Sequence, residues 1–325
     1  MNLCRRGVLR LAAGTLAVPA LSRIASAQAY PSRTVRIVVG FPAGGVNDII
    51  ARLIAEKLAE RLGQPFVVEN RAGAGSNIAT EGVVRASPDG HTLMMVGPPQ
   101  MINATLYNDL GFNFIRDIAP VAAVVRAPNV MEVTPSIPSM TVPEFIAYAK
   151  DNPGKINMAS SGIGTSQHVA GELFKMMTGT NLLHVPYRGI APALTDLIAG
   201  HVQVMFDPIL SSIEHIRSGR LRALGVTSLG RLDILPDVPS VGDFVPGYEA
   251  SSAYGIGAPR NTPADVIQIL NTAINAIVTE SHIRSRFANM GGTVLVGSPV
   301  DFAKIIAEET DKWGKVVKAS GARAD

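Results

Sequence analysis

The chain has 325 residues, 47% of them hydrophobic, with 29 Lys and Arg, 26 Asp and Glu and one cysteine. The near balance of charge, without a basic cluster, argues against a nucleic-acid partner, and a single cysteine rules out an intrachain disulfide. The length suits two domains of about 100–150 residues each.

The N-terminal segment has the three parts of a secretory signal peptide. Basic residues in the first ten positions precede an apolar run over 11–21, and small residues follow at 25–27. This order is typical of a cleavable leader, which we predict over 1–27. The run is shorter than the ~20 residues that span a bilayer, so no direct membrane insertion is expected. The paired arginines leave both the Sec and the twin-arginine export routes open.

Cleavage of this leader changes the charge of the chain. Cys4 and four arginines leave with it, and the net charge falls from +3 to −1. A mature chain without cysteine has no disulfide and no thiolate chemistry. This composition is compatible with a bacterial periplasm, which is the predicted location.

The first mature unit predicts a strand, a turn, a helix and a second strand. The run 35–41 is apolar and β-branched, a glycine-rich turn follows at 43–45, and 47–62 has apolar residues at helical spacing. Gly63 ends that helix, and a second strand begins at 66–69. Such a unit implies a parallel pair of strands covered by helices.

The alternation of strands and helices continues toward the C-terminus. Further strands are predicted at 92–96, within 118–133, and at 156–160, 182–185, 202–206 and 221–227. Helices are predicted after caps at Thr141, Thr262 and Ser298, and to follow the strands at 156–160, 182–185 and 202–206. The segment 235–248 is rich in Pro and Gly and predicts irregular structure.

This pattern predicts an α/β fold with two domains, each a βαβ-rich sheet flanked by helices. We place the crossings between the domains near Pro128 and near Ala250. The first domain is then discontinuous, with residues 28–128 plus 251–325, and the second has residues 129–250. Two crossings of this kind form a natural hinge.

Two glycine-rich turns, at 41–45 and 160–166, each follow a predicted strand and precede a predicted helix. The first amides of a helix lack internal partners, and the helix dipole favours negative charge there. Two such turns facing each other across a cleft would hold a dicarboxylate at both ends, although each is also compatible with an ordinary strand-to-helix turn. Neither turn has the phosphate-loop or dinucleotide spacing, so no cofactor is expected.

Individual polar residues near these turns leave alternatives open. No histidine pair has a familiar metal-binding spacing, so no metal is predicted. His168 either contacts a ligand or bonds its own loop, and Asp207 either binds a ligand ammonium or hydroxyl or caps the following helix. Ser161 and Ser166 lie near His168 but lack a nucleophile elbow and an acidic partner. We therefore predict no enzyme, with a periplasmic hydrolase as the less favoured alternative.

Ten short stretches in a fixed order carry a family resemblance. They lie at 30–31, 39–45 with Asp48 and Arg52, 63–65, 68–71, 72–75, 88–93, 152–155, 184–189, 221–224 and 235–240. Together they resemble the extracytoplasmic solute receptors of the tripartite tricarboxylate transporter family, also called Bug receptors. The resemblance runs through nearly the whole mature chain.

The resemblance implies a type II periplasmic-binding-protein fold that closes like a flytrap on a small carboxylate. Carried over by position, the ligand-binding residues are Phe41, Ala43, Gly44 and Gly45 at one end, Ser161, Gly162, Thr165, Ser166 and His168 at the other, and Asp207 as a specificity position. Pro98 stands where the family often has a small polar residue, and proline cannot donate a backbone hydrogen bond.

The resemblance also implies the partners. These are the large and small membrane subunits of a tripartite transporter, to which a monomeric receptor delivers its ligand. A ligand-sensing receptor that partners a signalling system is the alternative.

Overall fold

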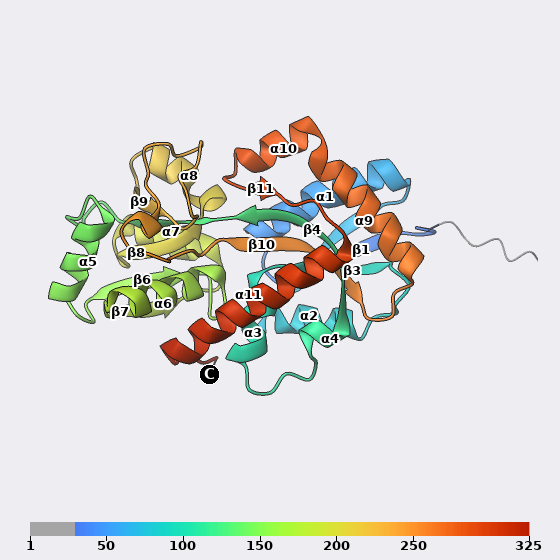
Figure 1. Ribbon diagram of the computed structural model, residues 1–325, viewed down its shortest axis with the longest axis horizontal. Helices are drawn as coiled ribbons and strands as arrows, with labels where there is room; N and C mark the ends of the chain where they lie inside the picture. The colour runs from blue at the N-terminus through green and yellow to red at the C-terminus, as the bar shows by residue number, and fades with distance from the viewer. Residues whose placement is uncertain (1–29, 325) are drawn as a thin grey trace, which may run out of the picture.

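The computed structural model describes residues 30–324 (Figure 1). The predicted signal peptide at 1–27 lies outside the described residues. Two sheets lie beside one another, a six-stranded sheet of order β11-β4-β10-β3-β1-β2 and a five-stranded sheet of order β7-β6-β8-β5-β9. Within the described residues, no helix combines the length and the hydropathy needed to cross a membrane.

The six-stranded sheet combines parallel and antiparallel strands. Its members are β1 (Val35–Val39), β2 (Phe66–Asn70), β3 (Thr92–Val96), β4 (Ile118–Ala127), β10 (Ser252–Pro259) and β11 (Thr293–Val294). β1 pairs in parallel with β2 and β3, whereas β10 runs antiparallel to β3 and β4. The carboxyl ends of β1, β2 and β3 therefore share one edge of the sheet.

The five-stranded sheet repeats this arrangement. Its members are β5 (Asn129–Val133), β6 (Ile156–Ser160), β7 (Leu182–Pro186), β8 (Val204–Pro208) and β9 (Arg222–Val226). β6 pairs in parallel with β7 and β8, and β5 runs antiparallel to β8 and β9. The carboxyl ends of three parallel strands again lie together, where α/β sheets collect ligands.

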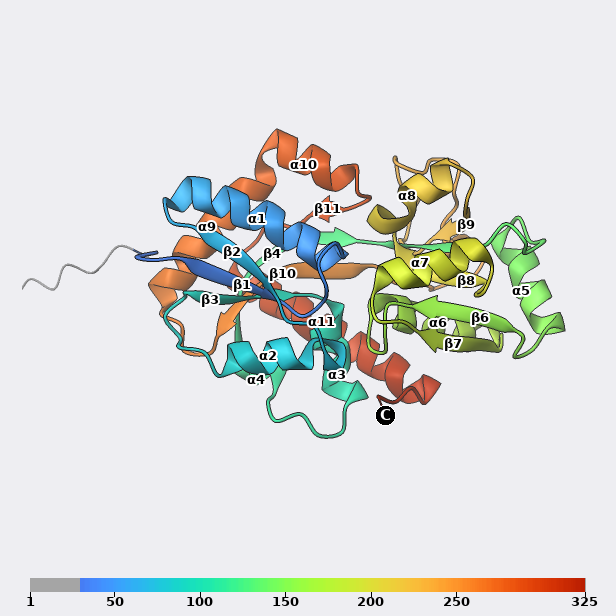
Figure 2. The same cartoon turned by 180° about the vertical axis from the view of Figure 1, so that it is seen from behind.

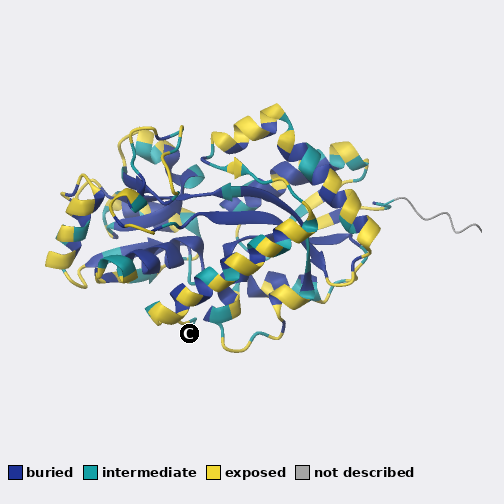
Figure 3. Ribbon diagram, viewed as in Figure 1, coloured by how far each residue is buried: buried dark blue, intermediate teal, exposed yellow. Residues whose placement is uncertain are grey.

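Helices cover both faces of the two sheets. They are η1 (Ala74–Ser76), α1 (Val46–Leu62), α2 (Asn77–Val84), α3 (Pro98–Leu106), α4 (Phe114–Asp117), α5 (Val142–Asp151), α6 (Ser166–Thr178), α7 (Ile190–Ala199), α8 (Ile209–Arg217), η2 (Val241–Asp243), α9 (Ala264–Thr279), α10 (Ser281–Ala288) and α11 (Pro299–Ser320). Figure 2 shows α1, α9 and α10 on one side of the six-stranded sheet, with α2 and α3 on the other. The strands β3, β5, β8 and β10 inside the sheets are entirely buried, whereas the edge strands β2, β7 and β11 are partly exposed (Figure 3).

The last helix, α11, packs against both sheets. Phe302 and Ile306 belong to the core of the six-stranded sheet, whereas Trp313 belongs to the core of the five-stranded sheet. Between them, Glu309 is 5% exposed and accepts hydrogen bonds from Arg126 at 2.6 Å and from the Trp313 indole at 2.8 Å. The helix thus connects the two cores, and the exact domain boundaries stay a prediction.

The predicted α/β class, with two sheets flanked by helices, is confirmed, and most local predictions hold. Ser298 caps α11 as predicted and accepts from the Asp301 amide. The cap predicted at Thr262 is wrong, because its hydroxyl donates to the Pro259 carbonyl and α9 begins two residues later. The Glu144 carboxylate accepts from the amide of Met140 rather than from that of the predicted cap.

Candidate functional site

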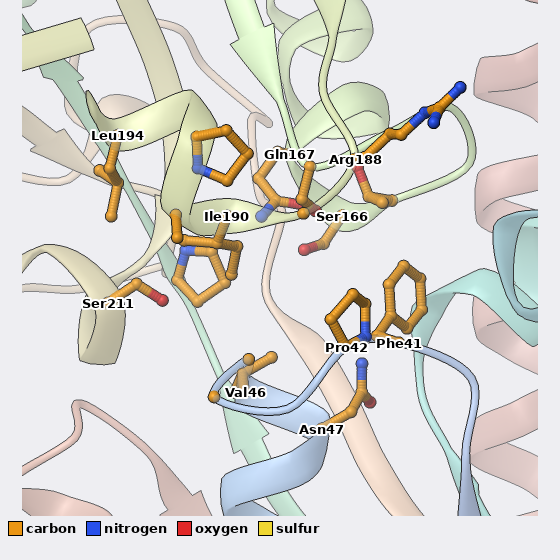
Figure 4. Close-up of a pocket in the computed structure, with 18 of the residues that line it drawn as sticks. Phe41, Pro42, Val46, Asn47, Ser166, Gln167, Arg188, Ile190, Leu194 and Ser211 are labelled. Atoms are coloured by element: carbon orange, nitrogen blue, oxygen red, sulfur yellow. The ribbon is translucent and has the colours of Figure 1, made fainter. Parts of the chain in front are cut away.

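A cavity of about 700 Å³ lies between the two sheets, at the carboxyl ends of their parallel strands. One wall comes from the segment 41–47, from the start of α3 and from Tyr254 of β10. The other comes from the segment 161–167, from 188–198 and from α8 with the residues that flank it. The cavity is therefore built by elements of both sheets (Figure 4).

Besides α3, which begins with two prolines, four helices begin at this cavity: α1, α6, α7 and α8. Val46, Ser166 and Ile190 are the first residues of three of them and line it, as do Pro208 and Ser211 around the start of α8. The first backbone amides of a helix have no acceptor within the helix, and the helix dipole gives this end partial positive charge. Four such ends make the cavity favourable for an anion.

A buried carboxylate holds the first turn in shape. Gly44 has φ +87°, a conformation that only glycine adopts readily. Its amide donates to Asp48 Oδ2 at 2.9 Å, and the same carboxylate accepts from Arg52 and Asn70. Burial alone raises the pKa of Asp48, but these hydrogen bonds outweigh it and bring the pKa below its ordinary value. The turn is thus pre-organised before any ligand binds.

The second turn is held by its own side chains. Thr165 Oγ1 donates to the Gly162 carbonyl at 2.7 Å and caps α6 by accepting from the His168 amide. His168 Nδ1 accepts from the Gly164 amide at 3.3 Å. The His168 side chain therefore bonds its own loop, which is one of the two alternatives that the sequence left open.

A second histidine lies directly behind this turn. The rings of His168 and His184 stack with centroids 4.1 Å apart, and His184 Nε2 lies 2.6 Å from Ser160 Oγ. Burial lowers the pKa of His168 to about 3 and that of His184 to about 4, with repulsion from Lys175 adding to both. Both rings are therefore neutral at neutral pH and pack as a polar support for the loop.

Asp207 lies in a buried network behind the cavity wall. It is fully buried and accepts from Gln167 Nε2 at 3.2 Å and from the Ser212 hydroxyl at 2.8 Å. The same hydroxyl lies 2.7 Å from Glu132 Oε1. A hydroxyl donates only one proton, so the second contact requires a proton on one carboxyl group. Burial raises the pKa of both acids, and their mutual repulsion raises that of Glu132 further.

The structure brings most of the predicted site residues together. Those that line the cavity are Phe41, Ala43, Gly44, Gly45, Ser161, Thr165 and Ser166. Gly162, His168 and Asp207 are not among the residues that line it. Within the described residues, no backbone amide of α8 donates to Asp207, so the capping alternative is not what the side chain does.

Sequence reasoning missed the wall formed by α7. Arg188, Gly189 and Ile190 line the cavity where β7 ends and α7 begins. The signal was present, because a strand, a glycine turn and a helix start follow one another here as they do at the two turns that were selected. Asn47 and Gln167 were also missed, although each lies in the first turn of a helix whose preceding turn was selected.

The charged side chains that line the cavity are all basic. No Asp or Glu lines it anywhere in the described part of the chain, whereas the cationic residues Arg188 and Arg220 do. Figure 4 shows the Arg188 side chain extending away from the other labelled side chains. Within residues 30–324 there is no cluster of three or more His, Cys, Asp or Glu that would hold a metal ion.

Comparison with known proteins places the chain in a family. The model of the tripartite tricarboxylate transporter family receptor matches residues 50–322. A UPF0065 protein from the tcbD-tcbE intergenic region of Pseudomonas sp. strain P51 is 37% identical over 97% of this chain and 94% of its own length. Protein BugT of Bordetella pertussis is 33% identical over 95% of each chain.

Solved structures agree with this placement. Rpa4515 of R. palustris, solved with adipate, has a TM-score of 0.87 and 36% identity over 90% of this chain and 98% of its own. The malate-bound MatC of Rhodopseudomonas palustris has a TM-score of 0.83 and 32% identity over 89% of this chain and 100% of its own. The periplasmic binding protein BugD has a TM-score of 0.85 and 33% identity over 91% of this chain and 100% of its own. The chain belongs to the tripartite tricarboxylate transporter receptor family, the Bug receptors, which are periplasmic solute-binding proteins rather than enzymes.

Proposed function

We propose that this protein binds a small carboxylate in the cavity between its two sheets and delivers it to a tripartite transporter in the membrane. The observation that carries the proposal is the convergence of four helix N-termini on a cavity whose described lining has no acidic side chain. A carboxylate there replaces its lost hydration with oriented backbone amides.

The relatives support the ligand class. Rpa4515 was solved with adipate and MatC with malate, both of them dicarboxylates. We propose that one carboxylate lies between the turn that contains Gly45 and the turn that contains Ser166. Of the other predicted contacts, Gly162 and His168 act by shaping the second turn, and Asp207 acts through Gln167.

Thermal unfolding with matched ligands tests the ligand class. We expect adipate to raise the Tm of the mature chain and adipamide, its uncharged diamide, to leave it unchanged. A ligand at about 100 times its Kd stabilises the folded state by about 2.7 kcal/mol, which corresponds to a shift of several degrees. Equal shifts with adipamide, or no shift with any mono-, di- or tricarboxylate, would refute carboxylate binding.

Delivery to a transporter requires export and a membrane partner. We propose export by the leader at 1–27, a monomeric mature receptor, and docking on the large and small membrane subunits. N-terminal sequencing of periplasmic protein, size-exclusion chromatography and uptake into vesicles that contain the membrane subunits test these points in turn. Uptake that proceeds equally well without the receptor contradicts the delivery role.

A further inference from the structure

We propose that the ligand is an elongated acid with a polar group at each end and an uninterrupted apolar middle, rather than a hydroxy acid or an amino acid. This inference rests on the proposed function, because it names the class of carboxylate that the same cavity takes.

An apolar stripe on α7 forms the middle of the cavity. Ile190, Leu194 and Ile198 follow at intervals of four residues, so they lie on one face of the helix, and all three line the cavity. Figure 4 shows Ile190 between Leu194 and Val46, with Pro42 nearby. These three side chains offer only methyl and methylene groups to a carbon chain. Thr195 of the same helix also lines the cavity, but its hydroxyl donates its proton to the Ala191 carbonyl.

Prolines confine the backbone donors to particular places. Pro192 occupies the third position of α7, where a helix otherwise presents a free amide, and Pro98 with Pro99 begins α3. All three line the cavity, and proline has no N–H to donate. The backbone donors that remain are those of the first turns of α1, α6 and α8 and the first amides of α7. A ligand is therefore bound through its polar ends and surrounded by apolar groups along its body.

The α8 wall supplies the second polar end. Ser211 and His215 are four residues apart on α8 and line the cavity together with Arg220. His215 Nδ1 is buried and has no hydrogen-bond partner among the described residues. Burial and then the charge of Arg220 lower the pKa of His215, so Ser211 and the Arg220 guanidinium are the polar groups that this wall offers to a ligand.

The two polar ends lie on opposite sides of Ile190. Figure 4 places Ser211, with Leu194, on one side of Ile190, and Ser166 on the other. The cavity volume of about 700 Å³ lies within the ~300–1,000 Å³ of pockets that enclose drug-sized ligands. A compact four-carbon acid leaves much of that space to water, whereas an elongated acid reaches both polar ends.

The absence of an acidic residue from the described lining argues against an amino acid. An ammonium group taken out of water requires a carboxylate partner, and no Asp or Glu lines the cavity. The nearby Asp207 already accepts from Gln167 and from Ser212. The ligand therefore carries acceptors at its ends and no cationic group.

Two acids of equal length test the apolar middle. Adipate and galactarate each have six carbons and two carboxylates, and galactarate carries a hydroxyl on each of the four middle carbons. We expect isothermal titration of the mature protein to give a Kd for adipate, or for the eight-carbon suberate, that is at least about 50-fold lower than for galactarate, since burial of several CH₂ groups separates them.

Variants then locate the two parts of the site. We expect Ile190→Asn to weaken adipate binding at least about tenfold without weakening that of galactarate, and Leu183→Asn to change neither. Leu183 is 55% exposed and outside the cavity lining. We expect Arg220→Gln to weaken adipate about tenfold and to leave hexanoate, which has only one carboxylate, unchanged.

The outcomes separate this inference from the proposed function. If galactarate, malate or aspartate binds more tightly than adipate and suberate, the inference of an apolar middle is overturned, but the protein is still a carboxylate receptor. If Arg220→Gln weakens the binding of adipate and of hexanoate equally, the α8 wall is not the second polar end of the site. Failure of every carboxylate to bind overturns the inference and the proposed function together.

Discussion

The stacked pair His168 and His184 predicts a loss of stability as the pH falls below neutrality. His168 is buried and His184 is half-buried behind the second turn, and the loss of hydration brings their pKa values to about 3 and about 4. In the unfolded chain each regains an ordinary pKa of about 6.5. Between these values the unfolded state binds protons that the folded state does not, so acid favours unfolding.

The size of the effect follows from the shifts. Each histidine contributes stability that is present above about pH 6.5 and is lost as the pH falls toward the folded-state pKa. Between about pH 7.5 and about pH 5, a shift of this size lowers the free energy of unfolding by about 2 kcal/mol per histidine. The pair therefore accounts for about 4 kcal/mol over that range.

A double variant isolates this contribution. His168→Asn keeps an acceptor near the Gly164 amide, and His184→Gln keeps a polar atom near Ser160, while neither side chain titrates. Urea unfolding at the two pH values gives the free energy of unfolding of each protein. We expect the wild type to lose about 4 kcal/mol more than the variant on going to the lower pH. Equal losses for both proteins would show that the histidines are not buried in the neutral form.

Three further predictions concern other parts of the fold. Glu309→Ala leaves a buried indole and an arginine without their acceptor, so we expect the free energy of unfolding, measured with urea, to fall by about 3 kcal/mol. The exposed control Glu308→Ala should lower it by at most about 0.5 kcal/mol, and equal losses contradict the buried network. Gly164 and Gly219 both have positive φ, but a Cβ at Gly164 would lie 2.5 Å from a side-chain oxygen of α3, whereas one at Gly219 would meet nothing within 4 Å. We therefore expect Gly164→Ala to lower the Tm more than Gly219→Ala, and equal shifts in Tm would exclude that contact. Glu132 has a raised pKa in the folded state, so its stabilising contribution is present at low pH and is lost as the pH rises. Above about pH 5, Glu132→Gln should become more stable than the wild type by up to about 1.4 kcal/mol per pH unit. A difference in the free energy of chemical unfolding that does not change with pH contradicts the buried proton.

The sequence predicted the parts of the fold that depend on local patterns. The strand predicted at 92–96 coincides with β3, and that at 156–160 coincides with β6. Both are short apolar segments, and their flanking residues mark where they end. The first glycine turn was recognised as a candidate site for the same reason, because a strand, a turn and a helix start follow one another in the chain.

Contacts between distant segments were not predictable in this way. His168 lies in α6 and His184 lies in β7, and their stacking depends on the parallel pairing of β6 with β7. Asp207 ends a strand, as expected, but Gln167 and Ser212 enclose its carboxyl group. The failed cap at Thr262 has a local cause, since a nearby carbonyl takes the hydroxyl instead.

A crystal structure of the mature protein with adipate tests the central claim most directly. We expect one carboxylate within hydrogen-bonding distance of backbone amides in the segments 43–47 and 161–167, with the aliphatic chain against Ile190 and the second carboxylate at the α8 wall. Adipate bound outside this cavity, or held inside it without contacts to the amides that begin α1 and α6, would contradict the claim that helix N-termini capture the ligand.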